Sequence, residues 1–166
     1  RETLLLEFSS TILCLLLAGK VGSNIASEIG TMRITEQIDA MEIMGVNSAN
    51  YLILPKITAL LVMMPLLNIV SIAVGLLGGY GVGAFTDIIT KADYILGIQY
   101  AFNPYYVTYG IIKSLVFAFL ITSISSYYGY SVRGGALDVG KASTSAVVNS
   151  SIIILFADLV LTKLLL

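Results

Sequence analysis

Four long apolar stretches alternate with short polar segments along the chain. Leu, Ile, Val, Ala and Gly dominate residues 3–30, 51–85, 105–130 and 141–166. Each stretch is long enough to cross the hydrocarbon core of a bilayer as an α-helix, which takes about 20 residues. None alternates in the two-residue pattern of an outer-membrane strand. The pattern therefore predicts an all-α polytopic transmembrane helix bundle, with residues 1–166 forming a single transmembrane domain.

One segment, residues 31–45, does not fit the apolar pattern. Ile34, Ile38 and Met41 recur at helical spacing and form one apolar side. The rest of its surface carries polar side chains: Arg33, Glu36, Gln37, Asp39 and Glu42. The segment therefore predicts a short amphipathic helix that lies along one face of the bundle with its acidic side free. A solvated loop helix would have the same periodicity, so the pattern alone leaves a binding role open.

Residues with cap preferences indicate the helix boundaries around this segment. Gly30 is expected to end the preceding helix, and Gly45 suits the left-handed position after the amphipathic helix. The side chain of Asn47 or Ser48 can accept a backbone N–H and cap the next helix. We therefore expect separate helices joined by short turns in this part of the chain.

Lys and Arg are distributed unevenly over the connections. The connections on one side of the predicted bundle contain Lys20, Arg33, Lys56, Arg133 and Lys141. The connection on the other side contains Lys91, and the chain ends add Arg1 and Lys163 there. Because basic residues gather on the cytoplasmic side of membrane proteins, residues 31–45 are predicted to lie in the cytoplasm and both ends of the chain outside.

The first apolar stretch has faces of different character. Its four-residue spacing produces a row of small residues that suits close helix packing: Ala18, Gly22, Ala26 and Gly30. A branched apolar row is expected to face lipid: Val21, Ile25 and Ile29. A polar row needs water or partners: Lys20, Asn24 and Glu28.

The composition excludes several classes of protein. The chain is 57% hydrophobic and 11% charged, whereas soluble domains average about 25% charged residues. An integral membrane protein fits these values better than a large soluble helical core does. The formal net charge of −1 provides no basic surface for nucleic acid. With one cysteine, Cys14, and no histidine, the sequence offers neither a disulfide framework nor a metal cluster nor a histidine-dependent triad.

Three charged residues of the predicted spans, Glu7, Lys113 and Asp158, are placed at membrane depth. Glu7 lies near the outer end of the first span, where an unpaired carboxylate facing lipid is costly, so it is expected to face an internal cavity. The alternative is that Glu7 reaches outward to the headgroups. Lys113 and Asp158 fall at matching depths on consecutive antiparallel spans, which predicts a structural ion pair. In the rival arrangement Lys113 reaches the headgroups and Asp158 bonds to a hydroxyl such as Thr122 or Ser123.

Two parts of the sequence resemble the MlaE-type permeases, the membrane subunits of ABC systems that move lipids between membranes. The first is "LAGKVGSNIASEIGTMRITEQIDAMEIMGVNSANYLILPKI", and the second is "KSLVFAFLITSISSYYGYSVRGGALDVGKASTSAVVNSSIIILFADLVLTKL". Family members carry a further N-terminal region with an interfacial helix and another span, so we expect this chain to be N-terminally truncated. One departure is "EFSS", Glu7 to Ser10, where the family usually has an acidic residue followed by Leu/Phe-Gly-Pro.

The resemblance implies a homodimeric, multi-pass permease of the bacterial inner membrane that moves phospholipids or related lipids. A separate cytoplasmic ATPase, an MCE-domain lipid-binding protein on the outer side and in some systems a STAS-domain protein are implied as partners. Residues 31–45 would then be the coupling helix that docks on the ATPase, and Glu7 would line the lipid pocket. No G-x-x-x-x-G-K-[ST] motif occurs, so no cofactor and no enzymatic activity are expected in this chain. An ion- or proton-coupled secondary transporter is the alternative, because Glu7, Lys113 and Asp158 lie at membrane depth.

Overall fold

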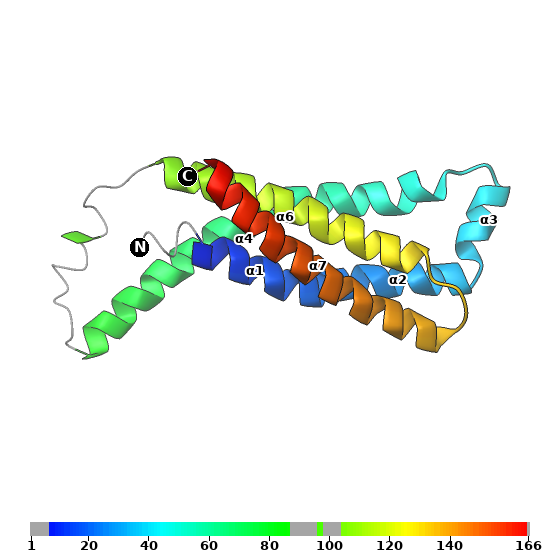
Figure 1. The fold of residues 1–166 in the computed structure, drawn as a ribbon, viewed down its shortest axis with the longest axis horizontal. Coiled ribbons are helices and arrows are strands. Elements are labelled where there is room, and N and C mark those ends of the chain that lie inside the picture. The colour runs from blue at the N-terminus through cyan, green and yellow to red at the C-terminus, as the bar shows by residue number, and fades with distance from the viewer. Residues whose placement is uncertain (1–6, 87–95, 98–103, 166) are drawn as a thin grey trace.

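A computed structural model describes residues 7–86, 96–97 and 104–165, and it is helical almost throughout these ranges (Figure 1). The elements, in chain order, are α1 (Ser9–Leu17), the π-helical turn η2 (Ala18–Gly22), α2 (Ser23–Ile34), α3 (Gln37–Ile43), α4 (Ser48–Thr86), α6 (Tyr105–Tyr130) and α7 (Ala136–Leu165). The part of the chain that the structure describes contains no strand, so the predicted all-α bundle is confirmed.

Four helical stretches are long and apolar enough to cross a membrane. They are Ser9–Ile34, Ser48–Gly83, Tyr105–Tyr130 and Ala136–Leu165. The first of them combines α1, η2 and α2. Helix α1 begins and α7 ends towards one end of the bundle, and α3 lies at the other, as four antiparallel spans require (Figure 1). The fold is that of a multi-pass membrane protein.

The break before the amphipathic helix falls later than predicted. Helix α2 continues through Gly30 to Ile34, so Gly30 does not end a helix and the amphipathic helix does not begin at residue 31. A Cβ atom at Gly30 would lie 3.2 Å from Val139 and 3.3 Å from Val132, so this glycine permits close packing instead. The chain turns at Glu36, whose φ of 59° is left-handed, and α3 is therefore shorter than the predicted segment.

Helix α3 ends as the sequence indicates. Gly45 adopts a φ of 79°, and its N–H donates to the carbonyl of Glu42 at 3.0 Å. The N–H of Val46 donates to the carbonyl of Met41, also at 3.0 Å. These two bonds form a Schellman motif, which needs a left-handed residue at the glycine position. The side-chain oxygen of Asn47 then accepts the N–H three residues further on, at 3.2 Å, and caps α4.

Helix α6 lies at the centre of the bundle and packs closely on α2. A Cβ atom at Gly129 would lie 2.7 Å from the backbone oxygen of Ala26, and one at Gly22 would lie 2.8 Å from the hydroxyl of Ser125. The small row of the first span is therefore the face that meets α6, as the spacing predicts. The apolar core beside this contact includes Cys14, Ala18, Leu60, Met64, Phe117, Ala118, Ile121 and Ile154.

The branched row of the first span does not face lipid, contrary to the sequence-based expectation. Ile25 and Ile29 are buried and form a small core with Ile38 of α3. The reason is that α3, the start of α4 and Tyr130 of α6 pack over this side of α2 and cover it. The polar row is the exposed one instead, since Lys20 and Asn24 both lie on the surface.

Helix α4 is a single helix of 39 residues that contains Pro55 and Pro65. Its first half packs on the bundle, and Lys56 forms an ion pair with Glu28 of α2 at 2.6 Å. Near its middle the buried side chain of Asn68 donates to the carbonyl of Gly110 in α6 at 3.1 Å. Its last part diverges from the other helices (Figure 1), which is consistent with its many exposed apolar side chains.

Candidate functional site

A buried lysine joins a carboxylate at the start of the described chain to one near its end. The side chain of Lys113 on α6 is fully buried, and its Nζ lies 2.6 Å from Oδ1 of Asp158 on α7. The same Nζ lies 2.8 Å from Oε2 of Glu7, just before α1. Three elements therefore meet at one ammonium group. In an apolar setting each charge would be costly alone, and the three stabilise one another.

Three hydroxyl side chains surround this ion cluster, and one of them, that of Thr11 on α1, donates to Oδ1 of Asp158 at 3.3 Å. The hydroxyl of Tyr109 lies one helical turn before Lys113 and donates to Oε1 of Glu7 at 3.3 Å. The hydroxyl of Thr162 lies one turn after Asp158, 2.9 Å from Oε1 of Glu7 and 3.1 Å from Nζ of Lys113. Four-residue spacing thus places Tyr109 and Lys113 on one side of α6, and Asp158 and Thr162 on the facing side of α7.

The structure brings Lys113 and Asp158 into direct contact, and Lys113 is buried instead of reaching the headgroups as in the rival arrangement. Asp158 does accept a hydrogen bond from a hydroxyl, but the donor is Thr11 of α1 at 3.3 Å. The hydroxyl of Thr122 donates to the carbonyl of Ala118 within its own helix at 2.8 Å. Glu7 points to Lys113 and keeps 37% of its side chain exposed. Its predicted role in substrate binding stays a prediction, as does the purely structural role of the ion pair.

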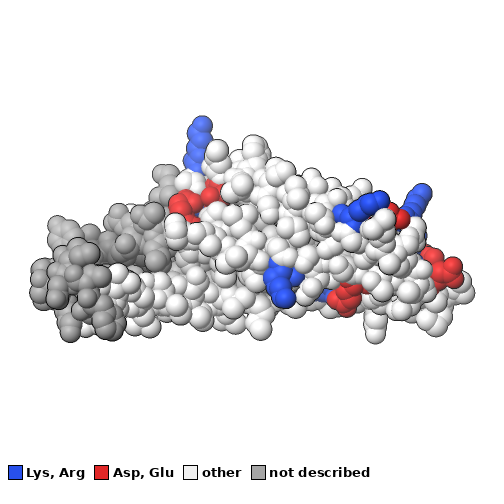
Figure 2. All heavy atoms as spheres, turned by 90° about the horizontal axis from the view of Figure 1, so that it is seen from below, with Lys and Arg blue, Asp and Glu red and all other residues white. Residues whose placement is uncertain are grey.

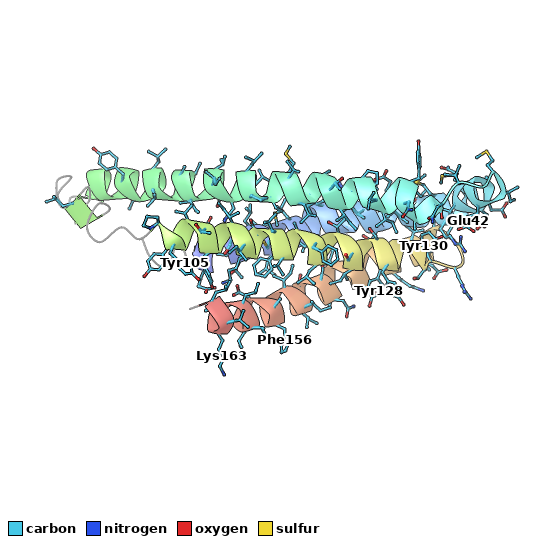
Figure 3. The ribbon with its side chains drawn as sticks, turned by 90° about the horizontal axis from the view of Figure 1, so that it is seen from above. Glu42, Tyr105, Tyr128, Tyr130, Phe156 and Lys163 are labelled. Carbon is cyan, nitrogen blue, oxygen red and sulfur yellow. The ribbon has the colours of Figure 1, made fainter. Side chains whose placement is uncertain are left out.

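A second cluster lies at the opposite end of the bundle, around Tyr130 at the end of α6. Its hydroxyl donates to Oε1 of Glu42 on α3 at 2.8 Å. The hydroxyl of Ser48, the first residue of α4, donates to the same oxygen at 3.0 Å and lies 3.0 Å from the tyrosine hydroxyl. Figure 3 shows Glu42 and Tyr130 at the same end of the molecule. This triangle ties α3 and α4 to α6.

Two further predicted residues belong to the same end. Arg33 of α2 forms an ion pair with Asp39 of α3 at 2.7 Å. The guanidinium carbon of Arg33 also lies 5.4 Å from the centre of the Tyr130 ring, within the range of a cation–π contact. Acidic and basic groups gather at this end of the molecule, whereas much of the neighbouring face is uncharged (Figure 2).

The environment of Glu42 favours its charged form. The hydrogen bond from Tyr130 lowers the pKa of the Glu42 carboxyl, and the bond from Ser48 lowers it further. Both donors stabilise the carboxylate and have no equivalent interaction with the protonated acid. Glu42 is therefore an ionised acceptor that holds two hydroxyl groups.

The remaining predicted residues of this segment are free of such contacts. Glu36 and Gln37 are exposed at the start of α3. The other end of α3 presents apolar side chains, with Ile43 87% and Met44 70% exposed. Beside this end lies an open recess of about 380 Å³, lined by Glu42, Gly45, Val46, Asn47, Ser48, Ala49 and Tyr130. The end of α3 thus offers an apolar surface next to a polar hollow.

Sequence reasoning missed five of the contributing residues: Thr11, Ser48, Tyr109, Tyr130 and Thr162. A signal was present for Tyr109 and Thr162, because each lies four positions from a charged residue on a predicted helix. No local signal marks Tyr130 or Ser48 as partners of Glu42, since their contacts depend on how α3 folds back. No group of three or more potential metal ligands occurs within the described residues.

The fold and these two clusters define a polytopic helical membrane protein with a short amphipathic helix at one end and a buried ion cluster towards the other. The family model described as "Permease MlaE" matches residues 1–164. The chain belongs to the MlaE permease family.

Curated relatives agree with this family. A "Probable ABC transporter permease protein" of Rickettsia bellii is 42% identical over 95% of this chain and 61% of its own length. The "Intermembrane phospholipid transport system permease protein MlaE" of Haemophilus influenzae is 32% identical over 98% of this chain and 63% of its own length. A chloroplast protein of Arabidopsis thaliana, TRIGALACTOSYLDIACYLGLYCEROL 1, is 34% identical over 95% of this chain and 45% of its own length. The chain thus spans about three fifths of the bacterial relatives.

Proposed function

We propose that the chain is the permease subunit of an ABC transporter that moves phospholipids between membranes, driven by a separate cytoplasmic ATPase. The observation that carries this proposal is α3, a short amphipathic helix held at one end of a four-span bundle in a member of the MlaE permease family. The name of the Haemophilus influenzae relative, a phospholipid transport system permease, supports phospholipid as the substrate.

The proposed ATPase contact is α3 together with the turn before it. Of the residues predicted for coupling, Arg33, Asp39 and Glu42 have partners within the chain. They would act by holding α3 in place, whereas Glu36 and Gln37 are exposed and available to a partner. The exposed apolar side chains at the other end of α3 would supply buried area in the same contact.

We propose that two copies of the chain form the working permease. Lys20 and Asn24 are exposed about halfway along the span Ser9–Ile34. A lysine exposed to lipid at the bilayer centre costs roughly 2.5–3.5 kcal/mol or more, so this face needs a polar cover. A second copy that encloses an aqueous or substrate-filled space would supply it.

The other partners follow from the family. An MCE-domain lipid-binding protein would act on the outer side, near the ion cluster, and Glu7 would contribute to the lipid pocket there. A STAS-domain protein is a further candidate partner on the ATPase. The bacterial inner membrane is the proposed location.

Cross-linking in native membranes tests the dimer. Asn24→Cys in a Cys14→Ser background should be joined into a dimer by a bis-maleimide long enough to cross the enclosed space, because this face of one copy is opposite the same face of the other. Val62→Cys, at a 65% exposed apolar position of α4 that needs no polar cover, is the control. Equal cross-linking at both positions, or none at position 24, would contradict the proposed dimer face.

Co-purification tests the rest of the assignment. The complex extracted from membranes should retain an ABC ATPase and bound phospholipid, both of which mass spectrometry identifies. The ion cluster is the observation that favours the second candidate, an ion- or proton-coupled transporter. A chain that purifies without any ATPase and carries ions down a gradient would favour that candidate instead.

A further inference from the structure

Helix α3 is too short to hold its own orientation. It has seven residues, and isolated helices of this length are unstable in water. Within α3, Ile38 is the buried apolar side chain. The orientation of α3 is therefore fixed by the few side-chain contacts that join it to the spans. Ile38 provides one contact near the start of α3, and the hydrogen bond between Tyr130 and Glu42 provides another near its end.

Tyr130 contacts three other helices at this end of the described chain. From the last position of α6 its hydroxyl bonds to Glu42 of α3 and contacts Ser48 of α4. Its ring lies against the guanidinium of Arg33 in α2. One side chain thus joins α3 and both neighbouring spans to α6.

Helix α6 extends from Tyr130 to the ion cluster without a break. Lys113 lies 17 positions before Tyr130, which is about 26 Å along an α-helix. Gly129 packs closely on Ala26, and α6 buries side chains along its length, so we expect this helix to move as one element. A movement imposed on α3 would therefore reach Lys113 through one stiff element.

We propose that Tyr130 is a positioning residue that couples α3 to α6, so that force applied to α3 by the ATPase reaches the ion cluster. Its hydroxyl keeps α3 attached to α6 throughout the transport cycle. This inference rests on the proposed function, because it supposes an ATPase that acts on α3. We call the contact of Tyr130 with Glu42 and Ser48 the α3 latch.

The test uses the complete permease reconstituted with its ATPase in phospholipid vesicles. Tyr130→Phe removes the hydroxyl and keeps the ring over Arg33. The lipid moved per ATP hydrolysed should fall by roughly fivefold or more, while assembly with the ATPase and ATP hydrolysis persist. Tyr127→Phe is the matched control, since Tyr127 lies on the same helix and is 68% exposed; its ratio should equal that of the wild type.

A cross-link separates a coupling role from a merely structural one. One variant combines Glu42→Cys and Tyr130→Cys in the Cys14→Ser background. Like Tyr130→Phe, it should move less lipid per ATP hydrolysed than the wild type. A short bis-maleimide that joins the two cysteines should restore the ratio, because the connection is rebuilt. A cross-linked complex that hydrolyses ATP and moves no lipid would overturn the proposal, since α3 and α6 would then have to separate.

Amide hydrogen exchange distinguishes failure of the latch from failure of the proposed function. In detergent, Tyr130→Phe should speed exchange of the α3 amides and leave the core of α6 unchanged. Unchanged exchange in α3 would overturn the latch, whatever the wild type transports. A wild-type complex that moves no lipid with ATP would overturn the proposed function, and the coupling role of Tyr130 with it.

Discussion

At the scale of single residues, charge pairing explains why polar groups occur inside so apolar a chain. Lys113 is fully buried, yet it has two carboxylates and a hydroxyl within 3.1 Å. Matching depth on two antiparallel helices was sufficient to predict its contact with Asp158. The third partner, Glu7, was not predictable from depth alone, because the rotation of the first span about its axis decides which side chains it presents.

The contacts within the ion cluster predict that alanine substitutions of its members lower the free energy of unfolding by different amounts. Lys113→Ala leaves both Asp158 and Glu7 without their cation, whereas Asp158→Ala leaves Lys113 with Glu7 as a partner. Each change should lower the free energy of unfolding, by roughly 3–5 kcal/mol for the lysine and less for the aspartate. Unfolding in mixed detergent micelles measures both. The double variant should lose clearly less free energy of unfolding than the two single variants lose together. Strict additivity of the two losses would argue against a coupled pair.

Glu42 predicts a pH-dependent contribution to stability. Because Tyr130 lowers the pKa of this carboxyl from its usual value of 4.5, the contact stabilises the fold fully above that pH and loses its effect as the pH falls through the lowered pKa. The melting temperature of Tyr130→Phe should therefore lie below that of the wild type at neutral pH, and the gap should narrow on acidification below pH 4.5. A gap that is constant with pH would mean that Glu42 does not respond to the hydroxyl.

At the scale of helices, the sequence predicts which helices exist and in what order more accurately than it predicts where each one begins and ends. The third predicted span, residues 105–130, coincides with α6, because a long apolar run between polar ends leaves little choice. The predicted start of α3 was wrong because, in the sequence alone, the glycine at position 30 suggests the end of a helix. In three dimensions it is a contact point with Val132 and Val139, and the turn falls at Glu36, a residue with no preference for a left-handed φ.

The contact between α2 and α6 predicts opposite effects at two glycines. Gly129→Ala would place a Cβ atom 2.7 Å from a backbone oxygen of α2, so the helices must separate and stability should fall by roughly 1–3 kcal/mol. Gly140→Ala on α7 meets no atom within 4 Å and should be neutral or stabilising by up to about 1 kcal/mol. Unfolding in mixed micelles compares the two. If the two substitutions changed the free energy of unfolding equally, α2 and α6 would not approach each other as closely as the structure shows.

At the scale of the whole molecule, the two clusters lie at opposite ends of one bundle, and the proposed function depends on this placement. Composition predicts the membrane setting, and the residues around α3 indicate the family. The internal partners of Glu42 and Asp39 could not be predicted, because the acidic side of α3 looks free until its fold against Tyr130 and Arg33 is known. That arrangement leaves Glu36, Gln37 and the apolar end of α3 for a partner.

ATP-dependent movement of phospholipid in reconstituted vesicles tests the central claim most directly. The permease and its ATPase would be reconstituted with a fluorescent phospholipid, and its transfer to acceptor particles would be followed. Transfer should require ATP and a catalytically active ATPase, and it should continue when ionophores abolish every ion gradient. A flux that is driven by an ion gradient in the absence of the ATPase, or lipid transfer that ATP does not accelerate, would contradict the assignment.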